Sequence, residues 1–166
     1  DGNQILKIPK PLIIRDGAKI MSLTDGNKKM SKSDPNENSR IALLDPPDLI
    51  TKKIKRAKTD SHLGLEFENP NRPEANNLLT LYAILSGLGR EVAAKECSEI
   101  GWGAFKPLLT EATVSAVQPI QKRYKELMKD RAQVNNILEA GRAKAEEVAQ
   151  STLERLQLAL GLHRKN

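Results

Sequence analysis

The sequence contains little that could cross-link the chain or anchor it in a membrane. Its 166 residues include one cysteine, Cys97, which excludes a disulfide framework and a cysteine zinc site and fits a reducing cytoplasm. No apolar run approaches the roughly 20 residues that span a bilayer. The first four residues lack the basic-then-apolar order of a signal peptide. The sequence therefore predicts a cytoplasmic protein without a membrane segment.

Aromatic residues are also scarce, at 3% of the chain, whereas hydrophobic residues make up 39% and charged residues 29%. This balance is typical of a globular protein. With few aromatic side chains, the core must be built from Leu, Ile, Val and Ala. Such a core favours packed helices over a β-sandwich.

The order of apolar residues, prolines and glycines predicts a mainly helical chain. Residues 18–23 read as a short apolar strand, and the polar residues 28–38 as a mobile loop without apolar anchors. A helix with Asp45 as its N-cap follows, with Pro47 in its first turn and apolar positions up to Ala57. Further helices are predicted over 74–86, 90–100, 104–128, with a kink or end near Pro119, and 131–160, capped by Asp130.

Positive charge is concentrated near the N-terminus. The chain carries a net charge of +6; residues 1–60 hold 13 Lys and Arg against 8 Asp and Glu, and residues 61–166 hold 14 against 13. This asymmetry indicates either a polyanionic partner or a basic surface that contacts only solvent.

The most informative segment is Lys29-Met30-Ser31-Lys32-Ser33. Two ammonium groups three residues apart in a polar loop can hold a polyphosphate, because lysine is a compact charge on a long stem. The hydroxyls of Ser31 and Ser33 add neutral donors. A loop that is merely solvated is the alternative.

This segment is identical to the KMSKS signature of class I aminoacyl-tRNA synthetases, and the surrounding sequence resembles the bacterial tryptophanyl-tRNA synthetases. The resemblance covers essentially the whole chain. Trp102 stands where this family is expected to have tyrosine. The segments that carry the resemblance are 17–23, 28–36, 52–60, 77–87, 101–106 and 119–124.

The resemblance implies that tryptophan is adenylated by ATP, with Mg²⁺ carried by the nucleotide, and is then transferred to tRNA(Trp). It implies that Lys29 and Lys32 stabilise the leaving pyrophosphate, and that Ile20, Met30, Ser31 and Ser33 help to enclose ATP. It also implies a homodimer. The family's His-Ile-Gly-His-type signature and its L-tryptophan pocket are expected N-terminal to residue 1, so this chain alone is expected to be inactive.

A second cationic group lies on the first predicted helix. Its side chains are expected to cover the solvent face, where they meet either tRNA phosphates or water. The group consists of Lys52, Lys53, Lys55, Arg56 and Lys58.

Several single residues carry weaker signals. Trp102 and Phe105 either stack an unpaired base or pack in the core. Asp34 either orients Lys32 or caps the next turn, and Cys97 reads as a small core residue. His62 has no nearby Cys or His set, so no protein-bound metal is predicted.

These patterns together predict a helical anticodon-binding bundle attached to the end of a Rossmann-like α/β domain. Residues 1–40 would be the end of that domain with the KMSKS loop, residues 41–128 the helical domain, and residues 129–166 a long helix returning to the α/β part. Two rivals stay open: a tyrosyl-tRNA synthetase relative, and a non-catalytic module that binds tRNA or protein.

Overall fold

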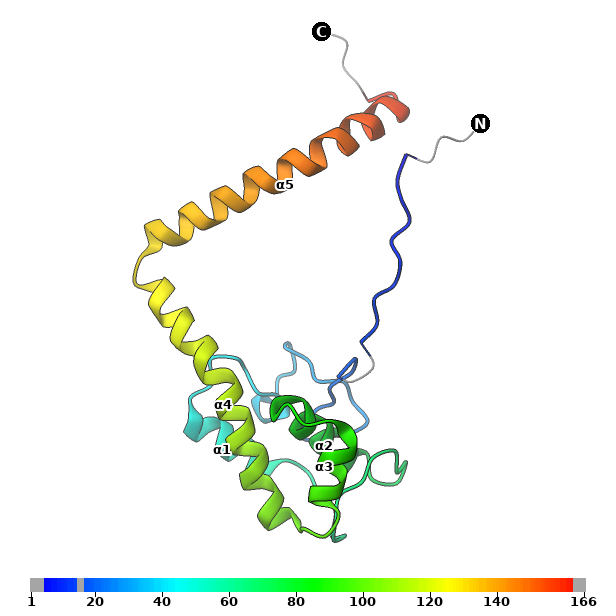
Figure 1. Cartoon of the computed structure of the whole chain (residues 1–166), viewed down its shortest axis with the longest axis vertical. Coiled ribbons are helices and arrows are strands. Elements are labelled where there is room, and N and C mark those ends of the chain that lie inside the picture. The colour runs from blue at the N-terminus through cyan, green and yellow to red at the C-terminus, as the bar shows by residue number, and fades with distance from the viewer. Residues whose placement is uncertain (1–4, 15–16, 163–166) are drawn as a thin grey trace. The chain divides into compact units, whose positions relative to one another are not determined.

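The computed structural model describes residues 5–14 and 17–162, and the regular structure in them is helical (Figure 1). A 3-10 turn, η1 (Glu37–Ser39), is followed by α1 (Pro47–Arg56), α2 (Pro73–Leu85), α3 (Arg90–Cys97), α4 (Trp102–Met128) and α5 (Arg131–Ala159). The prediction of a mainly helical chain is confirmed. None of these helices combines the length and apolar character needed to cross a membrane.

The chain divides into two units. We call residues 13–123 the core unit, and residues 1–12 with 124–166 the terminal unit. The expected domain boundary between residues 40 and 41 falls inside the core unit, since Leu23, Met30 and Ile41 pack in the same cluster as the helices. Helix α4 begins in the core unit and ends in the terminal unit.

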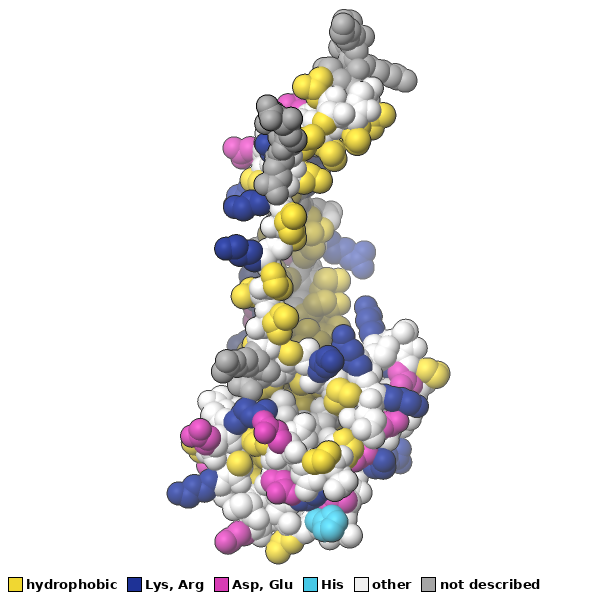
Figure 2. Space-filling view, turned by 90° about the vertical axis from the view of Figure 1, so that its right-hand side faces the viewer, with side chains coloured by type: hydrophobic (Ala, Val, Ile, Leu, Met, Phe, Trp, Pro, Cys, Tyr) yellow, Lys and Arg dark blue, Asp and Glu magenta, His cyan; other side chains and the backbone are white. Residues whose placement is uncertain are grey.

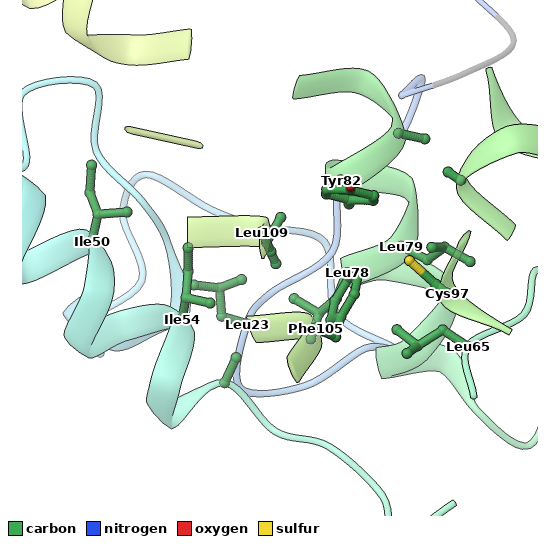
Figure 3. Close-up of a cluster of buried hydrophobic side chains, with 13 residues drawn as sticks. Leu23, Ile50, Ile54, Leu65, Leu78, Leu79, Tyr82, Cys97, Phe105 and Leu109 are labelled. Atoms are coloured by element: carbon green, nitrogen blue, oxygen red, sulfur yellow. The ribbon is translucent and has the colours of Figure 1, made fainter. Parts of the chain in front are cut away.

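The hydrophobic core lies in the core unit and draws on four helices and on two loops, through Leu23 and Leu65 (Figure 3). The ring of Phe105 is fully buried and meets the rings of Tyr82 and Trp102 edge to face, with centroids 5.7 and 5.8 Å away. Such contacts add to the burial of apolar area. The other largest buried side chains of the cluster are Leu23, Ile50, Ile54, Leu78, Leu79, Cys97 and Leu109.

Several predicted element ends are confirmed or corrected. Helix α2 matches its prediction within one residue at each end. Helix α3 ends at Cys97 rather than residue 100, and α4 begins at Trp102 inside the expected break. Pro119 lies within α4 and does not end it. Asp130 caps α5 as predicted, since its side chain accepts a hydrogen bond of 3.0 Å from the backbone N–H of Gln133.

The prediction that Asp45 caps α1 is wrong. Pro46 is extended, at φ −67° and ψ 156°, and the helix begins one residue later. The cause is Pro47, because a proline disfavours helical backbone in the residue before it. The carboxylate of Asp45 instead accepts from the backbone N–H of Ala42 at 2.9 Å and binds the ammonium of Lys53.

The predicted strand over residues 18–23 is also wrong. Within the described residues this segment forms a single β-bridge, between Met21 and Lys29. The pairing stops after Met30, because the chain turns again at Ser31–Asp34, where the Asp34 N–H faces the Ser31 carbonyl at 3.4 Å.

In the terminal unit, α5 has no buried face. None of its residues is buried, and Arg142 forms ion pairs with Glu139 and Glu146 one turn away on either side. Hydrophobic side chains, yellow in Figure 2, lie exposed along this helix; the large ones are Ile137, Leu138, Val148, Leu153 and Leu158.

Candidate functional site

The base of the KMSKS loop is a short antiparallel turn of backbone. Ser22 N–H donates to the Lys28 carbonyl at 2.7 Å, and Met30 N–H donates to the Ile20 carbonyl at 2.9 Å. These two bonds flank the Met21–Lys29 bridge. Ile20 and Met30, for which the family resemblance implies contact with ATP, therefore lie side by side across this base.

The tip of the loop is ordered by its own short side chains. The hydroxyls of Ser31 and Ser33 lie 3.1 Å apart, and Ser33 N–H donates to Ser31 Oγ at 3.3 Å. Asp34 Oδ1 accepts from the backbone N–H of Asn36 at 2.8 Å, and its carbonyl accepts from the Arg40 guanidinium at 2.7 Å. Asp34 thus shapes the turn that precedes η1, in keeping with the capping alternative.

The prediction that residues 28–38 lack apolar anchors is wrong. Met30 is half-buried and packs against the hydrophobic cluster, as does Ile41 after the loop. A methionine can fill an irregular gap in a core because its side chain is unbranched and flexible. The loop is therefore held to the core unit at Met30, in the middle of the motif.

The two motif lysines carry exposed positive charges. Lys29 and Lys32 are exposed, and neither ammonium forms an ion pair with any residue that the structure describes. Lys28, by contrast, is 3.6 Å from the carboxylate of Asp25. Ser31 and Ser33 are exposed beside them. Two exposed cations with neighbouring hydroxyls match the negative charge and the acceptor oxygens of a phosphate chain.

The cationic group on α1 is smaller than the sequence predicted. Lys52, Lys55 and Arg56 are exposed, but Lys53 is 4% exposed and its ammonium binds Asp45. Lys53 follows Ile50 by three residues, so it lies on the helix face that packs inward. The expectation that it covers the solvent face is wrong.

Lys58 follows α1 and is held by an acidic partner. Its ammonium lies 2.7 Å from Glu74 Oε1, and the hydrogen bond with that carboxylate raises the pKa of Lys58. Only Lys52, Lys55 and Arg56, of the five cations predicted to contact tRNA, are therefore both exposed and outside the ion pairs among described residues.

An apolar groove that the sequence did not predict lies beside α1. It has a volume of about 620 Å³ and is lined by α1 and the first four turns of α4, including Thr51, Lys55, Trp102 and Pro107. Lys106 closes one end of α1, donating to the carbonyls of Lys55 and Ala57 at 2.8 and 2.9 Å. Burial lowers the pKa of Lys106.

The remaining singled-out residues have structural partners. Phe105 is buried in the core, whereas Trp102 is half-buried at the groove and its indole N–H donates to Asp60 at 3.3 Å. Cys97 is buried, and burial raises the pKa of its thiol to about 11. His62 is exposed. Across residues 5–14 and 17–162, no group of three or more His, Cys, Asp or Glu side chains is placed to hold a metal ion.

Asn77 is a residue at this site that sequence reasoning missed. It is 3% exposed on α2, and its side-chain amide binds the backbone of Met21 at the base of the loop. The available signal was an asparagine next to Leu78 and one turn before Leu81, on the apolar side of a predicted helix, because a buried amide must find partners.

Known proteins that resemble this chain are tRNA synthetases. The family described as tRNA synthetases class I (W and Y) matches residues 2–118. The chain is 66% identical over 157 residues to a tryptophan–tRNA ligase of Prochlorococcus marinus (strain MIT 9313), covering 95% of this chain and 47% of the relative. It is 49% identical over 164 residues to the chloroplastic/mitochondrial tryptophan–tRNA ligase of Arabidopsis thaliana, covering 99% and 40%.

A solved structure agrees. The crystal structure of tryptophanyl-tRNA synthetase from Mycoplasma pneumoniae matches with a TM-score of 0.79 and 35% sequence identity, over 91% of this chain and 47% of that one. The chain spans about half the length of the curated relatives it matches. The family match covers most of the chain, including the loop at residues 28–38 and helices α1 to α3. The chain belongs to the class I tRNA synthetases for tryptophan and tyrosine.

Proposed function

We propose that this chain works as the C-terminal portion of a tryptophan–tRNA ligase, which joins L-tryptophan to tRNA(Trp) at the expense of ATP. In this reaction the tryptophan carboxylate attacks the α-phosphorus of ATP and pyrophosphate leaves. A hydroxyl of the terminal adenosine of the tRNA then attacks the adenylate carbonyl, and AMP leaves. The chain supplies the KMSKS loop for the first step and a cationic helix for the tRNA. The complete enzyme below means a protein of the relatives' full length that carries this chain.

One observation carries the proposal: Lys29 and Lys32 are exposed cations, outside the ion pairs of the described residues, on a loop whose base is fixed to a hydrophobic core. A cation held near pyrophosphate stabilises the transition state more than the ground state, because negative charge grows on the leaving group as its bond to phosphorus breaks. Ile20, Met30, Ser31 and Ser33 border the same loop and are assigned to ATP.

The metal in this proposal is Mg²⁺ that arrives with ATP, and no protein-bound metal is assigned. Tryptophan binds mainly in the half of the complete enzyme that this chain does not include. The complete enzyme is a cytoplasmic homodimer. Its α1 contacts the tRNA backbone through Lys52, Lys55 and Arg56, and α5 packs on the α/β domain through its apolar side chains.

The test is Lys32→Ala in the complete enzyme. We expect single-turnover adenylate formation at saturating ATP to slow by roughly 10²- to 10³-fold, which is the cost of removing one well-placed charge donor. Equilibrium tryptophan binding should be unchanged, because tryptophan carries no phosphate. Lys32→Arg should restore the rate in part, since a planar guanidinium follows a moving phosphate less well than an ammonium.

Adenylate formation at the normal rate in Lys32→Ala would remove this residue from the mechanism. The tyrosine rival is tested with the wild-type enzyme: ATP–pyrophosphate exchange should depend on tryptophan and not on tyrosine. If the chain is instead part of a non-catalytic protein, the full-length protein should exchange pyrophosphate with neither amino acid.

A further inference from the structure

Asn77 on α2 makes a paired contact with the base of the KMSKS loop. Met21 N–H donates to Asn77 Oδ1 at 2.8 Å, and Asn77 Nδ2 donates to the Met21 carbonyl at 2.9 Å. The two residues are 56 positions apart in the sequence. One side-chain amide therefore binds both backbone polar groups of a single residue, as a neighbouring strand would in an antiparallel sheet.

The geometry of the bridge explains why Met21 needs such a partner. The hydrogen bonds across the loop base come from Ser22 and Met30, on either side of the Met21–Lys29 pair. In a pair of this type, the N–H and C=O of the bridged residues point away from each other's strand. Without Asn77, the polar groups of Met21 would face the partly buried interior without a partner, which is costly.

Two further contacts fix the same part of the chain to the start of α2. The backbone of Gly26 lies so close to α2 that an added Cβ would be 2.6 Å from the Glu74 nitrogen and 2.7 Å from the Pro73 carbonyl carbon. Gly26 N–H also faces Glu74 Oε1 at 3.4 Å. The first turns of α2 thus hold the loop base at Gly26 and again, one helical turn later, at Met21.

We propose that Asn77 is a positioning residue for adenylation, which sets the place of Lys29 and Lys32 through Met21. Asn77 fixes Met21, Met21 is bridged to Lys29, and Lys32 follows three residues later in the tight turn of Ser31 and Ser33. A cation that must follow pyrophosphate has to start from a defined place. The inference rests on the proposed function.

The first variant is Asn77→Ala in the complete enzyme. The loop base loses both bonds, so we expect single-turnover adenylate formation to slow by roughly 10- to 100-fold, as small misplacements of a catalytic group do. Tryptophan affinity should stay at the wild-type value. The matched control is Asn76→Ala, which removes the same amide from the neighbouring position; Asn76 binds the backbone N–H of Glu68 at 3.2 Å rather than the loop.

The second variant, Asn77→Asp, separates positioning from a general loss of folding. An ionised carboxylate accepts from Met21 N–H but has no proton for the Met21 carbonyl, whereas a protonated carboxyl makes both bonds. Burial opposite a carbonyl raises the pKa of such a carboxyl. The adenylation rate of Asn77→Asp, relative to wild type at each pH, should therefore rise as pH falls from about 8 to 6.

Charges near this position do not produce the same trend. Glu74 lies one turn before Asn77 on α2 and is paired with Lys58 at 2.7 Å. Burial opposes the charge of Glu74, yet the hydrogen bond with Lys58 leaves its pKa below the usual value, and the pKa of Lys58 is raised. Asp25, across the turn, forms an ion pair with Lys28 at 3.6 Å. Wild type and variant share these groups, so the ratio of their rates cancels them.

The outcomes distinguish the two proposals. Slow adenylation in both Lys32→Ala and Asn77→Ala, with normal tryptophan binding, supports the inference. Slow adenylation in Lys32→Ala alone overturns it and leaves the proposed function intact. If Asn77→Ala loses tryptophan affinity and thermal stability together with rate, or if the Asn77→Asp ratio is flat with pH, then Asn77 serves only the fold and the inference is wrong. A normal rate in Lys32→Ala overturns the proposed function itself.

Discussion

Asp60 is the centre of an ion-pair cluster that holds the long loop between α1 and α2, and neutralising it should measurably destabilise the core unit. The guanidinium of Arg72 meets both carboxylate oxygens, through Nε at 2.8 Å and a terminal nitrogen at 3.0 Å. The indole of Trp102 donates to the same carboxylate. Arg72 is 7% exposed and also donates to the Gly64 carbonyl at 2.9 Å.

The size of the expected destabilisation follows from the pKa of Asp60. The hydrogen bond from Arg72 is the main reason that the pKa of Asp60 falls from 3.8 to about 2. Each pKa unit corresponds to about 1.4 kcal/mol, so the ionised carboxylate contributes roughly 2 to 3 kcal/mol to folding. Asp60→Asn keeps the shape and one acceptor oxygen but removes the charge. The free energy of unfolding should fall by about 2 kcal/mol near neutral pH, where a bidentate charged bond becomes a weaker neutral one.

The stability lost in Asp60→Asn should become smaller as the pH falls. The folded-state pKa of Asp60 is lowered, so its contribution is complete above the unfolded value of 3.8 and disappears as pH falls through about 2. The difference between wild type and Asp60→Asn should stay constant from about pH 7 to 5 and shrink between about pH 4 and 2. Other carboxylates titrate in both proteins and cancel in the difference.

Equilibrium urea unfolding of the 166-residue chain measures this difference. Trp102 is the only tryptophan and lies in the core unit, so its fluorescence reports on that unit, with far-UV circular dichroism as a second probe. Glu146→Gln is the control, because Glu146 and its partner Arg142 are both 61% exposed on α5 and such pairs contribute little. An Asp60→Asn loss that is equally large at the acid end would show that the carboxylate charge is not its cause.

Two further predictions concern α1 and the buried thiol. Lys52→Ala and Lys55→Ala should weaken tRNA binding by the complete enzyme and flatten the salt dependence of that binding by roughly one unit of slope per lost phosphate contact. Tryptophan-dependent ATP–pyrophosphate exchange should stay near normal. If both variants bind tRNA like wild type at several salt concentrations, the cations of α1 contact only solvent. Cys97, whose pKa burial raises to about 11, should resist alkylation in the native chain at pH values where it reacts readily in urea, and equal rates in both states would contradict its placement in the core.

The sequence predicted well those features that depend on local patterns. Helices α2 and α5 follow from apolar spacing and an aspartate cap, and both lie within one residue of their predicted ends. The KMSKS segment was found from five adjacent residues. Of the two alternatives for Phe105, burial in the core is the one that the structure shows.

The features that were missed depend on contacts between distant residues. Lys53 reads as one of five helix cations, yet Asp45, eight residues away, draws it inward. The strand expected at residues 18–23 pairs with its neighbour only at the Met21–Lys29 bridge, and on its other edge the side chain of Asn77, rather than a second strand, binds the Met21 backbone. No periodicity in the sequence shows that an amide on one helix will bind a backbone 56 residues earlier. Local rules therefore describe the helices better than the loop that they support.

Leu23 shows how closely the two candidate sites are joined. Its side chain is 1% exposed in the core, its N–H donates to the Ser39 carbonyl just after the KMSKS loop at 2.9 Å, and its carbonyl accepts from Lys58 N–H just after α1 at 2.8 Å. A substitution at Leu23 would disturb the loop and the cationic helix together, since one residue supports both. Lys32 and Lys52 have exposed side chains, so their removal leaves this scaffold in place. Only variants of exposed residues such as Lys32 and Lys52 can therefore test separately whether the loop serves adenylation and whether α1 binds tRNA.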